Sequence, residues 1–345
     1  MGGIHKNDDE IDRHVNRIKV YKVRRDNSEY NYRKLFRFTQ PNVAFLANTF
    51  FPPYYETRGG ALNNIRKMEI FLRYISDPGF QIGVREDIGV SQPSISRHIW
   101  NVCNLICDKA DHWICFPKNA RELEEAQRLW RTKYTFPYAI GAIDCTLIPI
   151  RKPRIHGNEF LCRKQFPAIN VQATVNADSI FTSVDCSWAG SVHDARIWRN
   201  SAIQTLMAQQ TSGAILLGDE GYPLAPYLMT CYRNPATPRE RAFNRVLKSE
   251  RTIIERAFGR LKQRFPMLYH KIRINTERIP KFITACFILH NIAIFLNDDE
   301  PFDEPQGDDE FENDEIENDD VPGNSELLRR GKVTRNAIAL MIQNE

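Results

Sequence analysis

The stretch YAIGAIDCTLIPI, residues 138–150, decides the fold expected for this chain. It is rich in β-forming residues, and its one charged residue is Asp144, at a place where a buried strand ordinarily has none. Two runs follow it, AINVQATVN at 168–176 and IFTSVDC at 180–186. They predict an antiparallel pair of strands joined by a short turn.

A second carboxylate ends a second buried run. A helix is expected from about 194 to 209, and GAILLG at 213–218 predicts a fourth strand that ends at Asp219. Burying two carboxylates among apolar strands is costly unless a cation neutralises them. A divalent metal ion would do so.

The segment RTIIERAFGRLKQRF, residues 251–265, predicts an amphipathic helix. Its apolar stripe consists of Ile254, Phe258, Leu261 and Phe265. The neighbouring face carries Arg251, Glu255, Gly259 and Lys262. A carboxylate beside cations suits a metal site that handles phosphates, although taken alone the pattern fits a solvated surface helix better.

Spacing favours the metal site. Asp219 and Glu255 have 35 residues between them, and the elements follow the β-β-β-α-β-α order of a ribonuclease H-like fold. The motifs GAIDCTLI, GSVHDARIW, LLGDEGYP, ERAFNRVLKSERTIIERAFGRLKQRF and CFILHNIA occur in this order. Together they resemble the PIF/Harbinger transposases and the Harbinger transposase-derived nucleases, over roughly residues 35–296.

The resemblance implies an α/β, ribonuclease H-like catalytic domain, a mixed sheet flanked by helices, preceded by an all-α helix-turn-helix-like domain. It implies a catalytic and metal-binding triad of Asp144, Asp219 and Glu255 that holds Mg²⁺ or Mn²⁺ as two ions. It also implies DNA cleavage, strand transfer in an active transposase, and a Myb-like DNA-binding partner. The sequence departs from the family pattern in Cys145 and Glu220, which follow the first two acids.

The pair His193 and Asp194 belongs to the same motifs. We expect both in a second shell around the metal, with Asp194 more readily explained as the cap of a helix. 

A helix-turn-helix is indicated by REDIGVSQPSISRHI, in which Ser91 can cap a helix with Pro93 in its first turn. The candidate DNA readers at the start of that helix are Gln92, Ser94, Ser96 and Arg97. A plain three-helix bundle explains the pattern almost equally well.

A basic strip follows the sheet region, with 11 Lys or Arg residues against 3 Glu between 239 and 273. Such a strip would bind DNA phosphates without regard to sequence. The contacts expected from it are Lys248, Arg251, Lys262 and Arg264.

Charge is unevenly distributed along the 345 residues. The formal net charge is +4, but residues 298–320 contain 14 carboxylates and no Lys or Arg, so the rest carries about +18. A basic body points to a polyanionic partner. Eight scattered cysteines without a CxxC pair favour a reducing compartment.

We expect a polar arm at 1–33, a helical domain at 34–130, the catalytic domain at 131–297, an acidic disordered linker at 298–324 and a short C-terminal helix at 325–345, broken by Gly331. No membrane segment is expected, because the longest apolar run, 283–296, is shorter than about 20 residues. The protein is expected in the nucleus, with the cytoplasm as a second location, and a homo-oligomer is left open.

The hypothesis is therefore a divalent-metal-dependent DNA endonuclease of Harbinger type. Two alternatives stay open at this point. One is a domesticated DNA-binding scaffold that no longer cuts, and the other is a helix-turn-helix transcriptional regulator.

Overall fold

The computed structural model describes residues 29–53, 62–77, 81–298 and 325–343. By its contacts the chain divides into two compact units, one of residues 1–74 and 80–102, the other of residues 75–79 and 103–345. Most of the expected N-terminal arm and all but the first residue of the expected acidic linker lie outside the described residues.

The first unit is helical, as predicted. It contains α1 (Glu29–Phe36), α2 (Gln40–Phe50), α3 (Asn64–Ile75), α4 (Gln81–Ile88) and the first part of α5 (Gln92–Cys107). An ion pair of 2.7 Å between Arg73 and Asp87 joins α3 to α4. The predicted stripe of α5 is confirmed, because all its members are buried: Ile95, Ile99, Val102 and Ile106.

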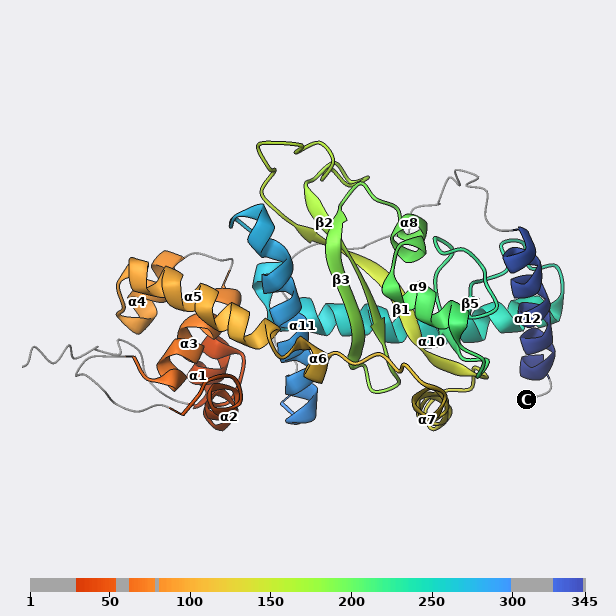
Figure 1. Cartoon of the computed structure of the whole chain (residues 1–345), viewed down its shortest axis with the longest axis horizontal. Coiled ribbons are helices and arrows are strands. Elements are labelled where there is room, and N and C mark those ends of the chain that lie inside the picture. The colour runs from red at the N-terminus through yellow and green to blue at the C-terminus, as the bar shows by residue number, and fades with distance from the viewer. Residues whose placement is uncertain (1–28, 54–61, 78–80, 299–324, 344–345) are drawn as a thin grey trace, which may run out of the picture. The chain divides into compact units, whose positions relative to one another are not determined.

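The second unit is built on a five-stranded mixed sheet (Figure 1). Its strands are β1 (Ala139–Pro149), β2 (Ala168–Val175), β3 (Phe181–Ala189), β4 (Ile215–Leu217) and β5 (Leu228–Met229), in the order β3-β2-β1-β4-β5. β1 pairs antiparallel with β2 and parallel with β4, and β2 pairs antiparallel with β3. The predicted α/β class and the first four strands are confirmed, whereas β5 was missed because two residues carry no periodicity.

Helices surround this sheet. They are α6 (Ala110–Trp113), α7 (Ala120–Arg131), α8 (Asp194–Arg199), α9 (Ala202–Gln209), α10 (Pro238–Arg264), α11 (Ile279–Phe295) and α12 (Ser325–Gln343). The single helix expected at 194–209 is two helices, because Ser201 begins a new one by accepting a hydrogen bond from the Gln204 backbone NH at 3.1 Å.

The long helix α10 passes behind the sheet in Figure 1 and contacts β1 and β2. A capping box of Thr237 and Glu240 starts it. Its predicted apolar stripe is buried, and Phe258 stacks on Phe181 of β3 at a centroid distance of 5.7 Å. α10 is thereby fixed on the sheet along the turns that carry Arg251 and Glu255.

Helix α7 belongs to the sheet unit, not to the helical domain in which the sequence placed it. The Glu250 carboxylate of α10 accepts hydrogen bonds from Trp130 Nε1 at 2.9 Å and from the backbone NH groups of Thr135 and Phe136 at 2.7 and 2.9 Å. Each of these donors is satisfied by one buried acid, so the end of α7 is pinned to α10.

The most apolar helical stretch, Thr276–Phe295, is long enough to cross a membrane by length and composition alone. In the structure most of this stretch is buried within the fold. Asn291 within it bonds the backbone of Phe181 with both ends of its amide, at 2.9 and 2.8 Å. This burial is that of a core helix, and α11 contacts β3, α10 and α6.

The C-terminal helix α12 is one unbroken helix, so the break expected at Gly331 was wrong. It packs on α10 and β5, and Gly331 faces the backbone of Ala225. The Arg335 guanidinium lies 3.9 Å from the Tyr232 ring centroid and donates to the Cys231 carbonyl at 2.9 Å. Gly331 is therefore a close-approach residue.

Gly331→Ala is expected to lower the free energy of unfolding by about 1 kcal/mol, because a Cβ there would stand 3.0 Å from Ala225 Cα. Gly259→Ala on α10 is the matched control, since its Cβ would meet no atom within 4 Å. That change should add about 0.5–1 kcal/mol through helix propensity. Urea titration of both variants measures the difference, and equal gains would refute the close approach as the reason for Gly331.

Candidate metal centre

Three carboxylates converge beside the middle of β1, just beyond the end of β4. One oxygen each from Asp144, Asp194 and Asp219 lies within 4.8 Å of the others, and all three residues are partly buried. Asp144 is on β1, Asp219 directly follows β4, and Asp194 is the first residue of α8. β1 and β4 are parallel neighbours, so the first two acids meet because of the sheet topology.

Local hydrogen bonds orient each acid. Asp144 accepts from the Cys145 backbone NH at 2.8 Å, and Asp219 accepts from the Gly221 backbone NH at 3.0 Å. Asp194 accepts from Asn170 Nδ2 of β2 at 3.0 Å. These donors hold one oxygen of each carboxylate, and the second oxygen of Asp144 accepts from Arg251.

The expectation that Asp194 caps a helix was wrong. The N-cap of α8 is His193, which makes no side-chain cap bond, and Asp194 lies one residue further on, inside the first turn. The sequence did flag Asp194 through its GSVHDARIW motif, but it gave no sign that the side chain joins the two strand acids. His193 itself is exposed, with Nδ1 3.3 Å from Arg163.

Glu255, the third acid of the expected triad, reaches the cluster through a cation. Arg251 is only 8% exposed and donates to Asp144 at 2.8 Å. Its other terminal nitrogen donates to Glu255, one turn along α10. The Glu255 side chain is 43% exposed and is not among the three converging acids.

Burial and like charge together oppose ionisation here. The pKa of Asp144 is raised to about 8 by desolvation and by the nearby Asp219, against the opposing effect of Arg251. The pKa of Asp219 is raised to about 6 by desolvation and by Asp194. Desolvation lowers the pKa of Arg251, but Asp144, Glu255 and Asp219 outweigh it and raise that pKa overall.

The donor set fits a hard divalent cation. Mg²⁺ and Mn²⁺ prefer carboxylate oxygens, and three converging acids are costly without a cation to neutralise them. The neighbouring Cys145 thiol is 3.2 Å from the Tyr222 hydroxyl, and desolvation raises its pKa well above the ordinary value. A protonated thiol is a poor metal ligand, so the centre offers oxygen and not sulfur.

Besides Arg251, two more of the four cations expected to bind DNA are buried in the fold. Lys262 is 8% exposed, and its Nζ donates to the Leu147 carbonyl at 3.2 Å. Arg264 is 4% exposed and bonds the backbone and side chain of Asp298. Lys262 thus contacts β1, whereas Arg264 contacts Asp298 just after α11, so Asp298 belongs to the fold.

The other expected DNA contacts occupy different places. Lys248 is exposed on α10, with Nζ 3.9 Å from Glu220, whereas Arg251 is the buried cation of the acid cluster. In the first unit, the expected readers stand at the beginning of α5, with three exposed and Ser94 half-buried: Gln92, Ser94, Ser96 and Arg97.

Comparison with known proteins agrees with this geometry. Residues 143–291 match the model of the DDE superfamily endonucleases. HARBI1 of Bos taurus, a nuclease by name, is 27% identical over 227 residues, 65% of this chain and 65% of that protein. The protein named ALP1-like of Arabidopsis thaliana is 25% identical over 268 residues, 72% of this chain and 65% of that protein.

This chain thus spans about 65% of the length of both relatives. No solved structure matches it. The matched region includes all three converging acids and the Arg251–Glu255 pair. Residues 143–291 are therefore similar to the DDE superfamily endonucleases, and 65% of the chain is similar to the nuclease named HARBI1.

Proposed function

We propose that this protein is a divalent-metal-dependent DNA endonuclease whose metal is held by Asp144, Asp194 and Asp219. The observation that supports this most is the convergence of the three carboxylates within 4.8 Å, in the region that matches the DDE endonucleases. Bound Mg²⁺ or Mn²⁺, as one or two ions, would supply Lewis-acid activation of a water or 3′-hydroxyl and stabilisation of the leaving oxygen.

The chain's own residues prepare the site for a phosphodiester. The backbone NH groups of Cys145 and Gly221 and the Asn170 amide orient the acids. Arg251 neutralises part of their charge and presents a cation beside the place where a phosphate would bind. The family resemblance makes Glu255 the third acid of the triad. We propose that Glu255 would bind the metal when a DNA phosphate replaces it as the anionic partner of Arg251.

The wider setting rests on the resemblance. We propose DNA as substrate, strand transfer if the chain is an active transposase, a nuclear location with the cytoplasm as a second one, and a Myb-like DNA-binding partner. Pull-down with the full-length chain as bait, followed by mass spectrometry, tests the partner. Light scattering tests whether a homo-oligomer forms.

The direct test of the proposed activity is the nicking of supercoiled plasmid by the purified full-length chain. With Mg²⁺ or Mn²⁺ we expect nicked circles, and with excess EDTA we expect none, because the acids alone cannot activate water. The double variant Asp144→Asn/Asp219→Asn, purified in parallel, controls for a contaminating nuclease. Equal nicking by parent and double variant would refute the assignment, and DNA binding without metal-dependent nicking would favour the silent scaffold.

A further inference from the structure

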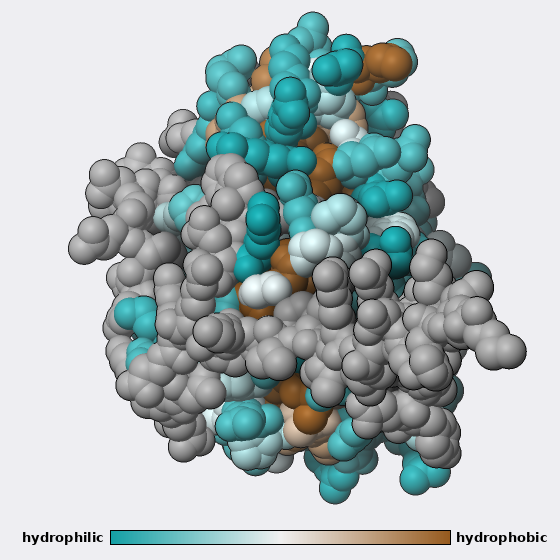
Figure 2. All heavy atoms as spheres, turned by 90° about the vertical axis from the view of Figure 1, so that its left-hand side faces the viewer, coloured by the Kyte–Doolittle hydropathy of each residue, from teal (hydrophilic) through white to brown (hydrophobic). Residues whose placement is uncertain are grey.

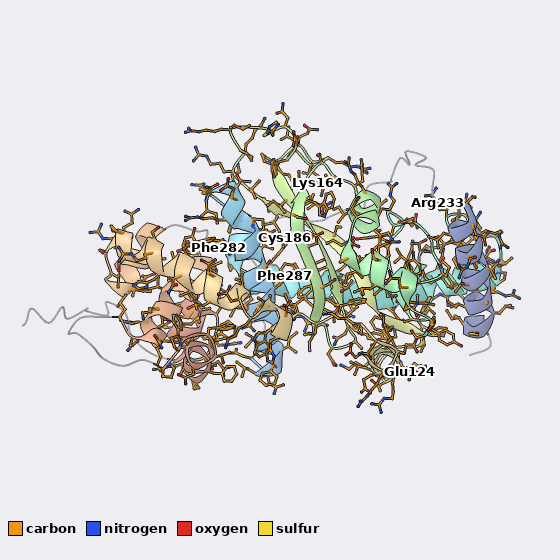
Figure 3. The ribbon with its side chains drawn as sticks, viewed as in Figure 1. Glu124, Lys164, Cys186, Arg233, Phe282 and Phe287 are labelled. Carbon is orange, nitrogen blue, oxygen red and sulfur yellow. The ribbon has the colours of Figure 1, made fainter. Side chains whose placement is uncertain are left out.

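The segment between β1 and β2, residues 150–167 and here called the β1–β2 loop, concentrates exposed positive charge. It projects at the top of Figure 1, and Figure 3 labels Lys164 on it. The loop has one carboxylate, Glu159, which lies 3.0 Å from His156. Its exposed cations are Arg151, Lys152, Arg154, Arg163 and Lys164.

The loop is anchored, so its cations have a defined position. At its start, the Arg151 backbone NH donates to the Ile272 carbonyl at 2.8 Å. Further along, the Cys162 side chain is 2% exposed, and the Cys162 backbone NH donates to the Phe166 carbonyl at 3.0 Å. A surface loop held at both ends loses little further entropy on binding.

The loop is also fastened to the segment that carries an acid of the metal centre. Ser191 Oγ donates to the Glu159 carbonyl at 2.6 Å, and the Arg163 guanidinium lies 3.3 Å from His193 Nδ1. His193 directly precedes Asp194. The loop cations are therefore fixed relative to the site where a phosphodiester would be cut.

Three of these cations are available to bind an anionic ligand. Within the described part of the chain, Arg151, Arg154 and Arg163 form no ion pair with a carboxylate, unlike the buried Arg251 and Arg264. Between them stands Ile155, which is 76% exposed and lies among hydrophilic neighbours. The space-filling view likewise shows a top surface that is mostly hydrophilic with small hydrophobic areas (Figure 2).

We propose that the β1–β2 loop binds duplex DNA beside the scissile phosphate. Its cations would contact the DNA phosphates, and Ile155 would enter a groove of the duplex. The inference deepens the proposed nuclease function, because it names the surface that holds the substrate. Exposed Arg and Lys side chains bind phosphates without reading sequence, and an exposed aliphatic side chain between them suits the sugar and base edges of a groove.

The test is the binding of a short labelled duplex to the full-length chain, followed by fluorescence anisotropy across a salt series, with Ca²⁺ in place of Mg²⁺. If Arg151 and Arg154 each neutralise one phosphate, Arg151→Ala/Arg154→Ala should weaken binding on the order of 50-fold at about 0.1 M salt and lower the salt slope by about 2. Ile155→Ser should weaken binding several-fold at an unchanged slope, because an apolar contact releases no counterion.

The matched control is Arg330→Ala/Lys332→Ala, which removes two exposed cations from α12. It should bind DNA like the parent. An equal loss in the control, parental binding by the loop variants, or a preference for single-stranded RNA over duplex DNA would each overturn the proposal. Thermal unfolding confirms that the exposed substitutions leave the fold intact.

Nicking assays on the same proteins separate this inference from the nuclease proposal. If the parent binds DNA but never nicks it, and a loop variant no longer binds, the nuclease proposal is refuted and the loop proposal is supported. If the parent nicks DNA, and the loop variants bind and nick as well as the parent does, the loop proposal is refuted and the nuclease proposal is supported.

Discussion

Asp144→Asn is expected to reduce metal-dependent nicking about 1000-fold or more, since losing a central metal ligand removes several kcal/mol of transition-state stabilisation. Asp144 is the acid of the cluster that Arg251 contacts, and desolvation together with Asp219 raises its pKa to about 8. Asp219→Asn should have a comparable effect. Single-turnover nicking with Mn²⁺ measures both.

The third ligand is decided by comparing Asp194→Asn with Glu255→Gln. Because Asp194 lies within the acid cluster and Glu255 reaches it through Arg251, we expect Asp194→Asn to weaken Mn²⁺ binding about 10-fold or more in the absence of DNA. Glu255→Gln should change that affinity far less, although it should impair nicking. The opposite ranking in calorimetry would make Glu255 the third ligand. Asp178→Asn, which removes an acid paired with Lys133 at the surface, is the matched control and should behave like the parent.

The affinity for Mg²⁺ or Mn²⁺ should rise about 100-fold between pH 6 and pH 8. The metal binds ionised carboxylates, whereas in the metal-free protein the pKa of Asp144 is raised to about 8 and that of Asp219 to about 6. Over this interval the competing protons leave, Asp219 first and Asp144 later. Calorimetric titration in two buffers of different ionisation enthalpy should show about one proton released per metal-binding event near pH 7.

The stability of the metal-free protein should move in the opposite direction. Both acids bind protons more tightly in the folded than in the unfolded chain, so their contribution to stability is complete below about pH 4 and is lost as the pH rises through the raised values near 6 and 8. Urea unfolding in EDTA from pH 5 to pH 8 tests this sign. Stability that rose with pH over this range would contradict the raised pKa values of the two acids. A metal affinity independent of pH would contradict them as well.

The sequence predicted the parts of the fold that rest on periodicity. The run at 138–150 and the two strands after it are rich in β-forming residues, and the stripe of α10 has helical spacing. The structure confirms these strands and the burial of the stripe. Strand β5 was missed because it has two residues, and the 194–209 segment was predicted as one helix because the break at Ser201 is a local capping event. Neither a two-residue strand nor a single capping residue changes the periodicity of the sequence.

The site was predicted in part for a similar reason. Asp144 and Asp219 are conspicuous because each interrupts or ends an apolar run. Asp194 begins a helix, where an acid is common, so only the three-dimensional arrangement shows that it joins them. Helical phase placed Arg251 beside Glu255 correctly, but phase does not report depth, and the side chains of Arg251 and Lys262 are both buried.

Helix α12, which follows the acidic residues in the sequence, packs on α10 and β5. Asp298, at the beginning of the acidic segment, is buried against Arg264, and Ser325, at its other end, starts the docked helix. Both ends of residues 299–324 are thus attached to the catalytic unit. Tethering of this kind keeps a segment at an effective concentration of the order of millimolar near its own domain. A chain truncated before α12 would keep the acidic residues 298–320 but lose the helix that covers Ala225 and Tyr232, so truncation and removal of charge are different experiments.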